Sequence, residues 1–469
     1  MIFTRWIKAG APLAALLLSM PGAQAADLSL QEAINMALAQ NTSLKITQKD
    51  EDTAKYALDE AKGDNGFSVT ASDSLSTSKS KGEARQDGNS VSVTGKLPLY
   101  SGGKNQAKIK KAELGLEAAD LETQRAQEDL KLSVIKAYYD ALEAKKTIAV
   151  RQETVDKYQE HFTNVSQLYA AGSKARIDVI RSQVELSDAR QNLIKAENSY
   201  EVSLAYLRNQ INMNRSEPLN LTTDFSYVGF DKELGGCIDY AYSNRKDLLI
   251  DKNKLAQQEQ SVKEAKAGYL PSLNLSLKVN QSNQFNPSSS DDYGATATLG
   301  LSWNIFDSGV TNAQVRTAQN NLDIARLNLL KDKEDIDYNL RQSYYNMREA
   351  EKRFNSTQDA VQQAEEDAFI AREKYRAGEG LMLDIIDAQE ALSKARLNYI
   401  SAQYDYARYK AEVENAMGLE LTAEEKAAAA RLETNADKVM AEPETAAQDA
   451  AAASTRKVAD ELAGNEVAK

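Results

Sequence analysis

Apolar residues recur at helical spacing over two very long stretches of the chain, 104–171 and 311–377. In the second stretch a seven-residue register is held by Val315, Leu322, Leu329 and Ile336. In the first stretch it is held by Ile109, Leu116, Thr123 and Leu130, with threonine as the polar member. A seven-residue repeat predicts helices that pack along their sides in a left-handed coiled coil. At 1.5 Å per residue each helix would span roughly 100 Å, which exceeds any globular core.

Shorter helices are predicted before and after each long one. Runs rich in helix-forming Ala, Leu, Glu, Lys and Gln predict helices of about 35 residues at 28–62 and 234–268. Helices of similar length are predicted at 175–211 and 381–417. The prolines outside the two ends of the chain fall between predicted helices, where they break no helical hydrogen bond.

Two segments, 67–100 and 271–306, alternate between apolar and polar side chains. The clearest alternation runs through Ala295, Ala297, Leu299, Leu301, Trp303 and Ile305. A period of two predicts strands with one apolar and one polar face. Each segment is long enough for two strands and a polar loop, and each strand reaches the roughly 9–11 residues that a tilted membrane strand needs.

Aromatic residues help to choose between two kinds of sheet. One aromatic side chain stands near the helix-side end of each predicted strand: Phe67, Tyr100, Tyr269 and Phe306. Such residues are typical of the aromatic girdle of a membrane β-barrel. The alternative is a soluble sheet with one buried face, but the helices bury their own apolar seams and leave no partner for that face. The pattern therefore favours strands that face outer-membrane lipid.

Short motifs occur twice in the chain at a spacing of about 206 residues. Tyr169-Ala170-Ala171-Gly172, for example, recurs as Tyr375-Arg376-Ala377-Gly378. Several matches at nearly one offset predict internal duplication of a helix–strand–strand–helix unit. The predicted copies are residues 26–230 and 231–421.

The two ends of the chain differ from its middle. Residues 1–25 combine basic residues, a short apolar run and a small-x-small cleavage pattern, which predicts a signal peptide. Residues 422–469 are rich in Ala, Glu, Asp and Thr without an aromatic residue, which predicts a disordered or loosely helical acidic tail. The rest of the chain has no apolar run of about 20 residues, so no transmembrane helix is expected.

Composition argues against several classes of function. The formal net charge is -12, whereas a nucleic-acid-binding protein needs a basic face. The one cysteine, Cys237, excludes an intramolecular disulfide and is expected to pack beside Ile238. The one histidine, His161, is expected on the surface of a helix. Without a Cys/His cluster or a glycine-rich phosphate loop, we expect no catalysis, no metal and no cofactor.

Four strands are too few to close a barrel that has a lumen. Backbone groups at an open sheet edge would lack hydrogen bonds in lipid. The predicted fold class is therefore a mixed α+β membrane protein that completes its sheet by oligomerisation. A trimer would give a twelve-stranded barrel.

Together these features resemble the TolC family of outer-membrane efflux and type I secretion proteins. The resemblance reaches to about Leu421 and includes Ser101-Gly102, Ser308-Gly309 and the segment 375–387. It implies a homotrimer whose outer-membrane β-barrel continues into a long periplasmic α-helical coiled-coil barrel with an equatorial collar. It also implies a passive exit duct, supplied by an inner-membrane RND or ABC transporter through a periplasmic adaptor protein.

The resemblance assigns roles to residues at the periplasmic tip. Asp384 and Asp387 match a ring of paired aspartates that forms the gate. Tyr375 and Asp178 match a lock that holds the closed state. The family has a basic residue in this lock where this chain has Gly380.

Gly172 and Gly378 match the hairpin turns that contact the adaptor. A local explanation stays open for these residues, because a glycine after a helix often serves only to supply a positive φ. The three aspartates likewise fall in first helical turns, where a carboxylate is favourable to the helix dipole.

Two other functions remain open from the residues alone. A structural or adhesive coiled-coil protein of the cell envelope would also have long helices. A periplasmic adaptor would have helical hairpins, but it would lack two pairs of membrane-like strands.

Overall fold

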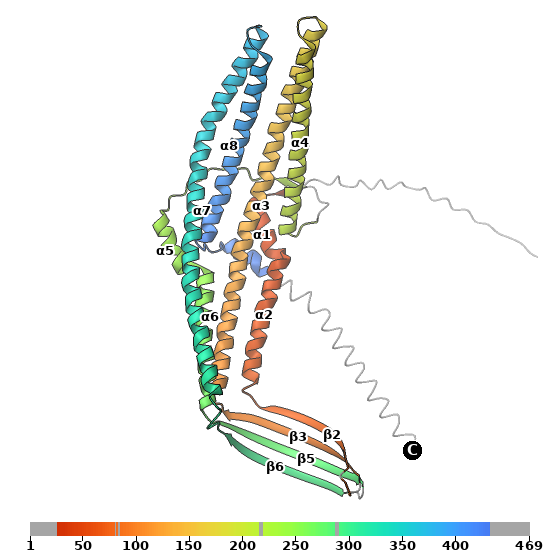
Figure 1. Ribbon diagram of the computed structural model, residues 1–469, viewed down its shortest axis with the longest axis vertical. Helices are drawn as coiled ribbons and strands as arrows, with labels where there is room; N and C mark the ends of the chain where they lie inside the picture. Colours follow the sequence, from red (N-terminus) through yellow and green to blue (C-terminus); the bar gives the residue numbers. More distant parts are fainter. Residues whose placement is uncertain (1–25, 80, 83–84, 215–218, 287–289, 432–469) are drawn as a thin grey trace, which may run out of the picture.

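The computed structural model describes residues 26–431, except 80, 83–84, 215–218 and 287–289 (Figure 1). The predicted signal peptide, 1–25, lies outside the described residues, as does most of the predicted tail, 432–469. The described chain is an elongated bundle of helices with a sheet at one end and two helical hairpins at the other (Figure 1).

Two helices of 67 residues each run most of the length of the bundle, α3 (Lys104–Ala170) and α7 (Val310–Arg376). Each turns back into a helix of 35 residues, α4 (Arg176–Gln210) and α8 (Met382–Ala416). These bounds lie within one residue of the predicted ends because the seven-residue pattern stops at the glycine turns.

The predicted helix 28–62 is wrong in one respect, because it consists of two helices. Helix α1 (Leu30–Gln40) ends and α2 (Thr42–Gly63) begins at Asn41, whose φ of -63° and ψ of 128° are extended. The Asn41 side chain accepts hydrogen bonds from the backbone N–H groups of Ser43 and Leu44, at 2.9 and 3.2 Å. A helix N-cap thus forms in the middle of the predicted helix.

The predicted helix 234–268 is broken in the same way. Helix α5 (Leu234–Asn244) and α6 (Lys246–Lys266) meet at Arg245, with a φ of -63° and a ψ of 127°. The guanidinium of Arg245 pairs with Asp247 and donates to the carbonyl oxygen of Ala416 at 2.8 Å. The break therefore interrupts the helix at a residue whose side chain contacts the end of α8.

The short helices accompany the long ones in pairs. Helices α2 and α4 follow each other along α3, and α6 and α8 follow each other along α7 (Figure 1). The long-helix seams are buried at Val315 and Ile336, while the polar Thr123 is buried and donates to Glu51 at 2.8 Å. The polar seam position is thus satisfied by a partner on α2.

Four antiparallel strands form one sheet in the order β2-β3-β5-β6. They are β2 (Ser68–Ser78), β3 (Gln86–Tyr100), β5 (Ser272–Asn286) and β6 (Ser290–Ser302). The first pair joins the second through β3 and β5, so β2 and β6 are the two edges. Each edge strand has a neighbour on one side within the described chain.

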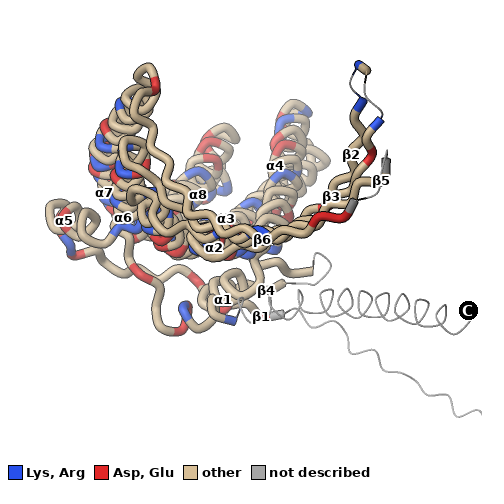
Figure 2. The backbone as a smooth tube through the Cα atoms, turned by 90° about the horizontal axis from the view of Figure 1, so that it is seen from below, with Lys and Arg blue, Asp and Glu red and all other residues tan. Residues whose placement is uncertain are grey.

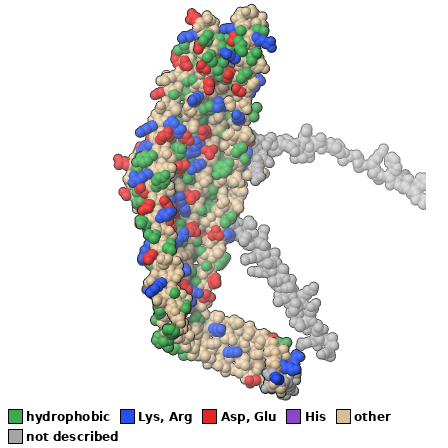
Figure 3. All heavy atoms as spheres, in the orientation of Figure 1, with side chains coloured by type: hydrophobic (Ala, Val, Ile, Leu, Met, Phe, Trp, Pro, Cys, Tyr) green, Lys and Arg blue, Asp and Glu red, His purple; other side chains and the backbone are tan. Residues whose placement is uncertain are grey.

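The sheet projects away from the helices and curves, with no helix lying on it in the described part (Figures 1 and 2). Large apolar side chains stay open on it: Val69, Leu75, Leu299 and Leu301 are 62%, 81%, 63% and 69% exposed. Charged side chains are scattered over the helices but sparse on the visible face of the sheet, except at its far end (Figure 3). The apolar face thus lacks a partner among the described residues.

A two-stranded sheet that the sequence pattern did not predict stands beside the middle of the bundle. Strand β1 (Ala26–Leu28) pairs in parallel with β4 (Leu219–Leu221). The Tyr138 hydroxyl on α3 donates to the Leu28 carbonyl oxygen at 2.9 Å and accepts from the Thr223 N–H at 3.0 Å. One buried hydroxyl therefore fixes both connecting segments to the long helix.

The tail was predicted to be disordered or loosely helical, and its first described part is a helix that packs against the bundle. Residues 423–431 form a helix, and Ala428 and Ala429 are buried in the apolar cluster of α1 and α3. Glu425 is 1% exposed. Alanines on one face of this short helix pack against α1 and α3. The high polar content of the segment gave no sign of this apolar face.

Among the described residues, every helix is too short or too polar to cross a membrane.

Candidate gate at the helical tip

The two hairpins end in glycine turns at the end of the molecule opposite the sheet (Figure 1). Gly172 and Gly378 have φ values of 75° and 79°, a region that favours glycine. After Gly172, the Ser173 N–H bonds back to the Leu168 carbonyl oxygen at 2.8 Å, as in a helix-ending motif. The local explanation for both glycines is therefore confirmed, and contact with an adaptor stays a prediction.

Each hairpin has its own small apolar core near the tip. The α3–α4 core consists of Val155, Tyr158, Leu186 and Ala189. The α7–α8 core consists of Ala368, Ala371, Ala388 and Leu392. Neither cluster includes residues of the other hairpin, so the two hairpins are held to each other by other contacts.

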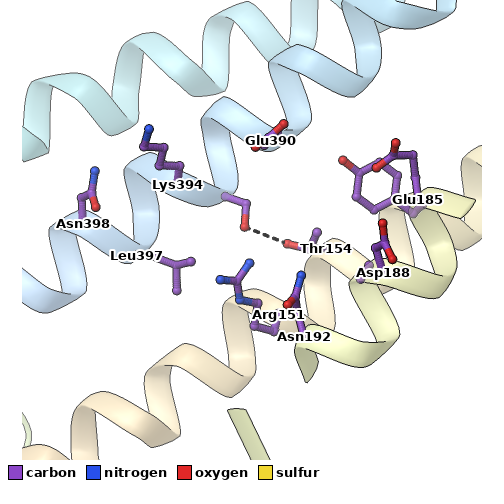
Figure 4. A pocket seen from close by; sticks show the side chains of 12 residues that line it. Arg151, Thr154, Glu185, Asp188, Asn192, Glu390, Lys394, Leu397 and Asn398 are labelled. Atoms are coloured by element: carbon purple, nitrogen blue, oxygen red, sulfur yellow. Dashed lines mark hydrogen bonds between the residues drawn. The ribbon is translucent and has the colours of Figure 1, made fainter. Parts of the chain in front are cut away.

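The contacts between the hairpins are largely polar. Arg396 on α8 binds Glu153 on α3 at 2.6 Å and Glu365 on α7 at 2.8 Å. The hydroxyls of Thr154 and Ser393 lie 3.3 Å apart across the same boundary (Figure 4). Polar contacts can exchange for water, so such a boundary opens at a lower free-energy cost than a shared apolar core.

A cavity of about 500 Å³ lies between the hairpins, lined by α3, α4 and α8 (Figure 4). Carboxylates of Glu185, Asp188 and Glu390 line it together with Arg151 and Lys394. Burial raises the pKa of Glu185, and the charges of Asp188 and Glu390 raise it further. Three carboxylates and two cations therefore line this cavity.

Asp384 and Asp387 lie one turn apart on α8, and both are exposed. The carboxylate of Asp384 accepts a hydrogen bond from the Leu381 N–H at 2.9 Å, which caps the helix. Burial raises the pKa of Tyr158 to about 12, and the charge of Asp387 is among the carboxylates that add to this rise. The structure thus gives Asp384 its local role, and the ring of aspartates stays a prediction.

The structure does not join the two predicted lock residues by a hydrogen bond. Tyr375 is half-buried, and its hydroxyl is buried without a hydrogen-bond partner among the described residues. Asp178 is half-buried in the first turn of α4. Instead, the Tyr375 ring contacts His161 on α3, with 5.7 Å between ring centroids, and Lys174 Nζ, which lies 4.4 Å from the ring centroid.

His161 was expected on the surface of a helix, but it is half-buried. Its Nε2 atom is buried without a partner in the described structure, and its ring contacts Tyr375 of the other hairpin. Burial lowers the pKa of His161, and Lys174 lowers it further, whereas Glu160 raises it. A surface position was expected because the helical pattern of α3 does not show which side the second hairpin covers.

Gly380, where the resemblance implies a basic residue, lies in a tight turn. A Cβ atom placed on Gly380 would lie 2.9 Å from the backbone nitrogen of Tyr375 and 3.1 Å from Cβ of Lys374. The turn also bonds the Gly380 N–H to the Lys374 carbonyl oxygen at 3.1 Å. This tight turn has no room for the family's basic side chain.

The four predicted girdle residues lie at the helix-side end of the sheet, and all are exposed. Their exposed fractions are 60% for Phe67, 46% for Tyr100, 48% for Tyr269 and 84% for Phe306. A bound lipid interface at this level stays a prediction. Among the described residues, no three His, Cys, Asp or Glu side chains are grouped so that they could hold a metal ion.

Comparison with known proteins gives the family of the chain. The family model described as "Outer membrane efflux protein" matches residues 33–212 and 237–419, which is more than half of the chain. TolC of Escherichia coli K12 is 23% identical over 71% of this chain and 70% of its own length. The toxin and drug export protein A of Aggregatibacter actinomycetemcomitans is 23% identical over 61% of this chain and 63% of its own.

Solved structures show the same fold. The Campylobacter jejuni CmeC outer membrane channel matches with a TM-score of 0.71 at 19% identity, over 83% of this chain and 85% of that chain. The alignment spans less than two thirds of the length of the toxin and drug export protein, at 63%. The chain belongs to the outer membrane efflux protein family, a family of channel proteins, and is an outer-membrane protein.

Proposed function

We propose that three copies of this chain form a passive duct through the outer membrane. The four-stranded sheet supports this proposal. Its edge strands β2 and β6 each have a neighbour on one side only among the described residues, and these residues leave its apolar face uncovered. Lipid could cover that face, and neighbouring copies could pair with β2 and β6 to give a twelve-stranded β-barrel. The helices would then continue the barrel into the periplasm as a coiled-coil barrel.

An internal duplication would explain how one chain supplies four strands. The order of α1, α2, β2, β3, α3 and α4 is repeated by α5, α6, β5, β6, α7 and α8. The family model also matches twice, once in each half. We assign residues 26–230 and 231–421 to the two copies, with α1, α5 and their neighbours forming a collar around the middle.

The duct would receive its cargo from other proteins. One relative is named for export of toxin and drug, and another for secretion of alkaline protease. By analogy, the partners would be a periplasmic adaptor, contacting the turns at Gly172 and Gly378, and an inner-membrane RND or ABC transporter. The chain itself would act without catalysis, cofactor or metal.

The periplasmic gate would lie where the hairpins end. In a trimer, Asp384 and Asp387 would be repeated three times around the axis. A ring of carboxylates of this kind attracts cations. Tyr375 and Asp178 would help to hold the closed position. The two separate hairpin cores and the polar boundary between them support a hairpin that moves as a unit.

Conductance of the purified protein in planar lipid bilayers tests this proposal. We expect discrete channels that divalent cations block from the side of the helical tip. Changing Asp384 and Asp387 together to alanine should weaken that block and reduce cation selectivity. The matched control is Asp359→Ala with Asp367→Ala, which removes the same charge from exposed sites on α7. Unchanged block in the gate variant would contradict the gate, and absence of channels would contradict the duct.

The alternative, a structural or adhesive protein of the cell envelope, is less well supported. The family match and the named channels favour the duct. An adhesive coiled coil would also have no use for a sheet with an open apolar face. Its specific expectation is an outer-membrane protein that conducts nothing in bilayers.

A further inference from the structure

Three side chains meet where the two hairpins come together near the tip. His161 belongs to α3, Lys174 to the turn between α3 and α4, and Tyr375 to α7. The His161 and Tyr375 rings lie 5.7 Å apart between centroids, at an interplanar angle of 59°. Lys174 Nζ lies 4.4 Å from the centroid of the Tyr375 ring, within reach of a cation–π interaction. Tyr375 is therefore held by two side chains of the opposite hairpin.

This contact contains two buried polar atoms for which the described part of the chain offers no hydrogen-bond partner. They are Nε2 of His161 and the hydroxyl of Tyr375. A buried polar atom without a partner is costly, and that cost is recovered when water reaches it. The packing of the two rings thus holds the hairpins together. The two unpartnered polar atoms favour separation, because water can then hydrogen-bond to them.

The surroundings of His161 are predominantly cationic. A cavity of about 680 Å³ adjoins it between the hairpins. The titratable and charged side chains that line this cavity are Lys157, Tyr158 and Glu160 of α3 and Arg372, Tyr375 and Arg376 of α7. Lys174 adds a further positive charge, while the α8 residues that line the cavity, Ile385 and Gln389, are uncharged.

Part of this charge is already paired. Glu160 lies 3.8 Å from Lys157, and Arg376 lies 3.1 Å from Glu373. The carboxylate of Glu160 therefore has a cation beside it before His161 gains a proton. A positive charge on the imidazole would lose hydration, because its Nε2 atom is buried in the contact.

We propose that the contact of His161, Lys174 and Tyr375 is a pH-sensitive latch between the two hairpins. The neutral imidazole packs against the tyrosine ring and keeps the hairpins together. A protonated imidazole loses hydration in the closed contact and is better hydrated when the hairpins part. Acid therefore releases the latch, and the consequence for transport rests on the proposed duct.

The direction follows from proton linkage. Burial lowers the pKa of His161 in the closed contact; the charge of Glu160 opposes this and outweighs that of Lys174, but burial decides the direction. Above the ordinary histidine pKa of 6.5 both states are neutral, and the closed contact keeps its full stability. Below that value the parted state binds the proton more readily, so the ratio of closed to parted hairpins falls by up to about tenfold per pH unit in each chain.

The latch also accounts for the missing basic residue at position 380. The tight turn leaves no space for a side chain at Gly380, as its close approach to Tyr375 shows. Lys174 brings a cation to the same tyrosine from the other hairpin.

Distance measurement between the hairpin turns tests the latch without requiring transport. Spin labels at Ser173→Cys and Glu379→Cys, with the buried Cys237 changed to alanine, report the separation by pulsed electron paramagnetic resonance. Labelled chains diluted with unlabelled full-length chains restrict the signal to one chain. Between about pH 7.5 and about pH 5.5, which brackets histidine titration, we expect the distance to lengthen and broaden.

Two variants identify the group responsible. His161→Phe keeps an aromatic contact but cannot titrate, so its distance should stay short at both pH values. Lys174→Gln removes the cation, so its hairpins should part further at neutral pH yet still respond to acid. A pH response that persists in His161→Phe, or an unchanged distance in the parent protein, would overturn the latch. A distance change in a protein that forms no channels would support the latch and refute the duct alone.

Discussion

Lys131 Nζ lies 2.9 Å from Glu425 Oε2, and the glutamate side chain is only 2% exposed. The same carboxylate accepts a hydrogen bond from the Thr422 N–H at 2.8 Å. Burial alone would raise the pKa of Glu425, but the hydrogen bonds from Lys131 and Thr422 outweigh it, so the pKa is lowered. This ion pair fastens helix 423–431 to α3 in the middle of the bundle.

Removing one partner of this buried pair should be costly. Lys131→Met is expected to lower the free energy of unfolding by about 3–5 kcal/mol, because it leaves a buried carboxylate unpaired. The control Lys426→Met breaks an exposed pair with Glu420, which should cost less than about 1 kcal/mol. Chemical unfolding measures both, and equal effects would show that burial of Glu425 does not matter.

The pH dependence of this pair has a definite sign. The pKa of Glu425 in the folded protein lies below its ordinary value of 4.5. The contribution of the ionised Glu425 to folding stability is therefore complete above pH 4.5 and is lost as the pH falls through the folded pKa. The hydrogen-exchange protection factors of residues 423–431, which are corrected for the intrinsic pH dependence of exchange, should therefore fall in acid. Glu425→Gln should remove this acid-dependent step.

The hydroxyl of Tyr138 supports the small β1–β4 sheet. Tyr138→Phe deprives the Leu28 carbonyl and the Thr223 N–H of their buried partner, at an expected cost of about 1–3 kcal/mol. Tyr139→Phe removes a hydroxyl for which the described residues give no hydrogen bond, and should cost much less. Thermal unfolding compares the two, and a larger effect at Tyr139 would contradict the assignment.

The sheet requires glycine at position 95. A Cβ atom there would lie 2.7 Å from Cζ of Phe67, whereas one at Gly300 would meet only a backbone oxygen at 3.9 Å. Gly95→Val should displace the Phe67 ring at a cost of about 1–3 kcal/mol and lower the yield of heat-modifiable oligomer. Gly300→Val is the control, and Phe67→Ala should restore the yield of Gly95→Val.

Two carboxylates of α6 and α7 share a site in the lower half of the bundle. Burial raises the pKa of Asp251 to about 6, and a hydrogen bond and the charge of Asp332 add to the rise. A folded pKa above the ordinary 3.8 means that stability is lost as the pH rises through about 6. Asp332→Asn should raise the melting temperature above that pH and have little effect well below 3.8, where Asp251 is protonated in both the folded and the unfolded chain. Asp335→Asn, which removes a carboxylate paired with exposed Lys331, should show no such gain.

The long helices and strand pairs were predictable because their periods persist over many residues. The breaks at Asn41 and Arg245 were not predicted, since neither is glycine or proline. Asn41 did carry a signal, as an asparagine that can cap Thr42 onward, whereas Arg245 depends on Ala416, 171 positions away in the sequence. The three-residue β1 strand is too short to show any period.

The candidate gate was predicted only in outline. The glycine turns and the aspartates could be recognised from local sequence, but the contact between His161 and Tyr375 joins residues on two different hairpins. A side chain's neighbours across a bundle depend on helix rotation, which a pattern of apolar residues fixes only approximately. Burial of Glu425 was missed for the same reason, because its partner Lys131 lies on a distant helix.

The central claim is that this chain leaves its sheet open and that two further copies close it. Native mass spectrometry of the protein extracted from outer membranes with mild detergent tests this claim most directly. If three copies close the sheet, the spectrum shows a complex of three chains that separates only on heating. A monomer, or a protein recovered from the soluble periplasmic fraction, would contradict it.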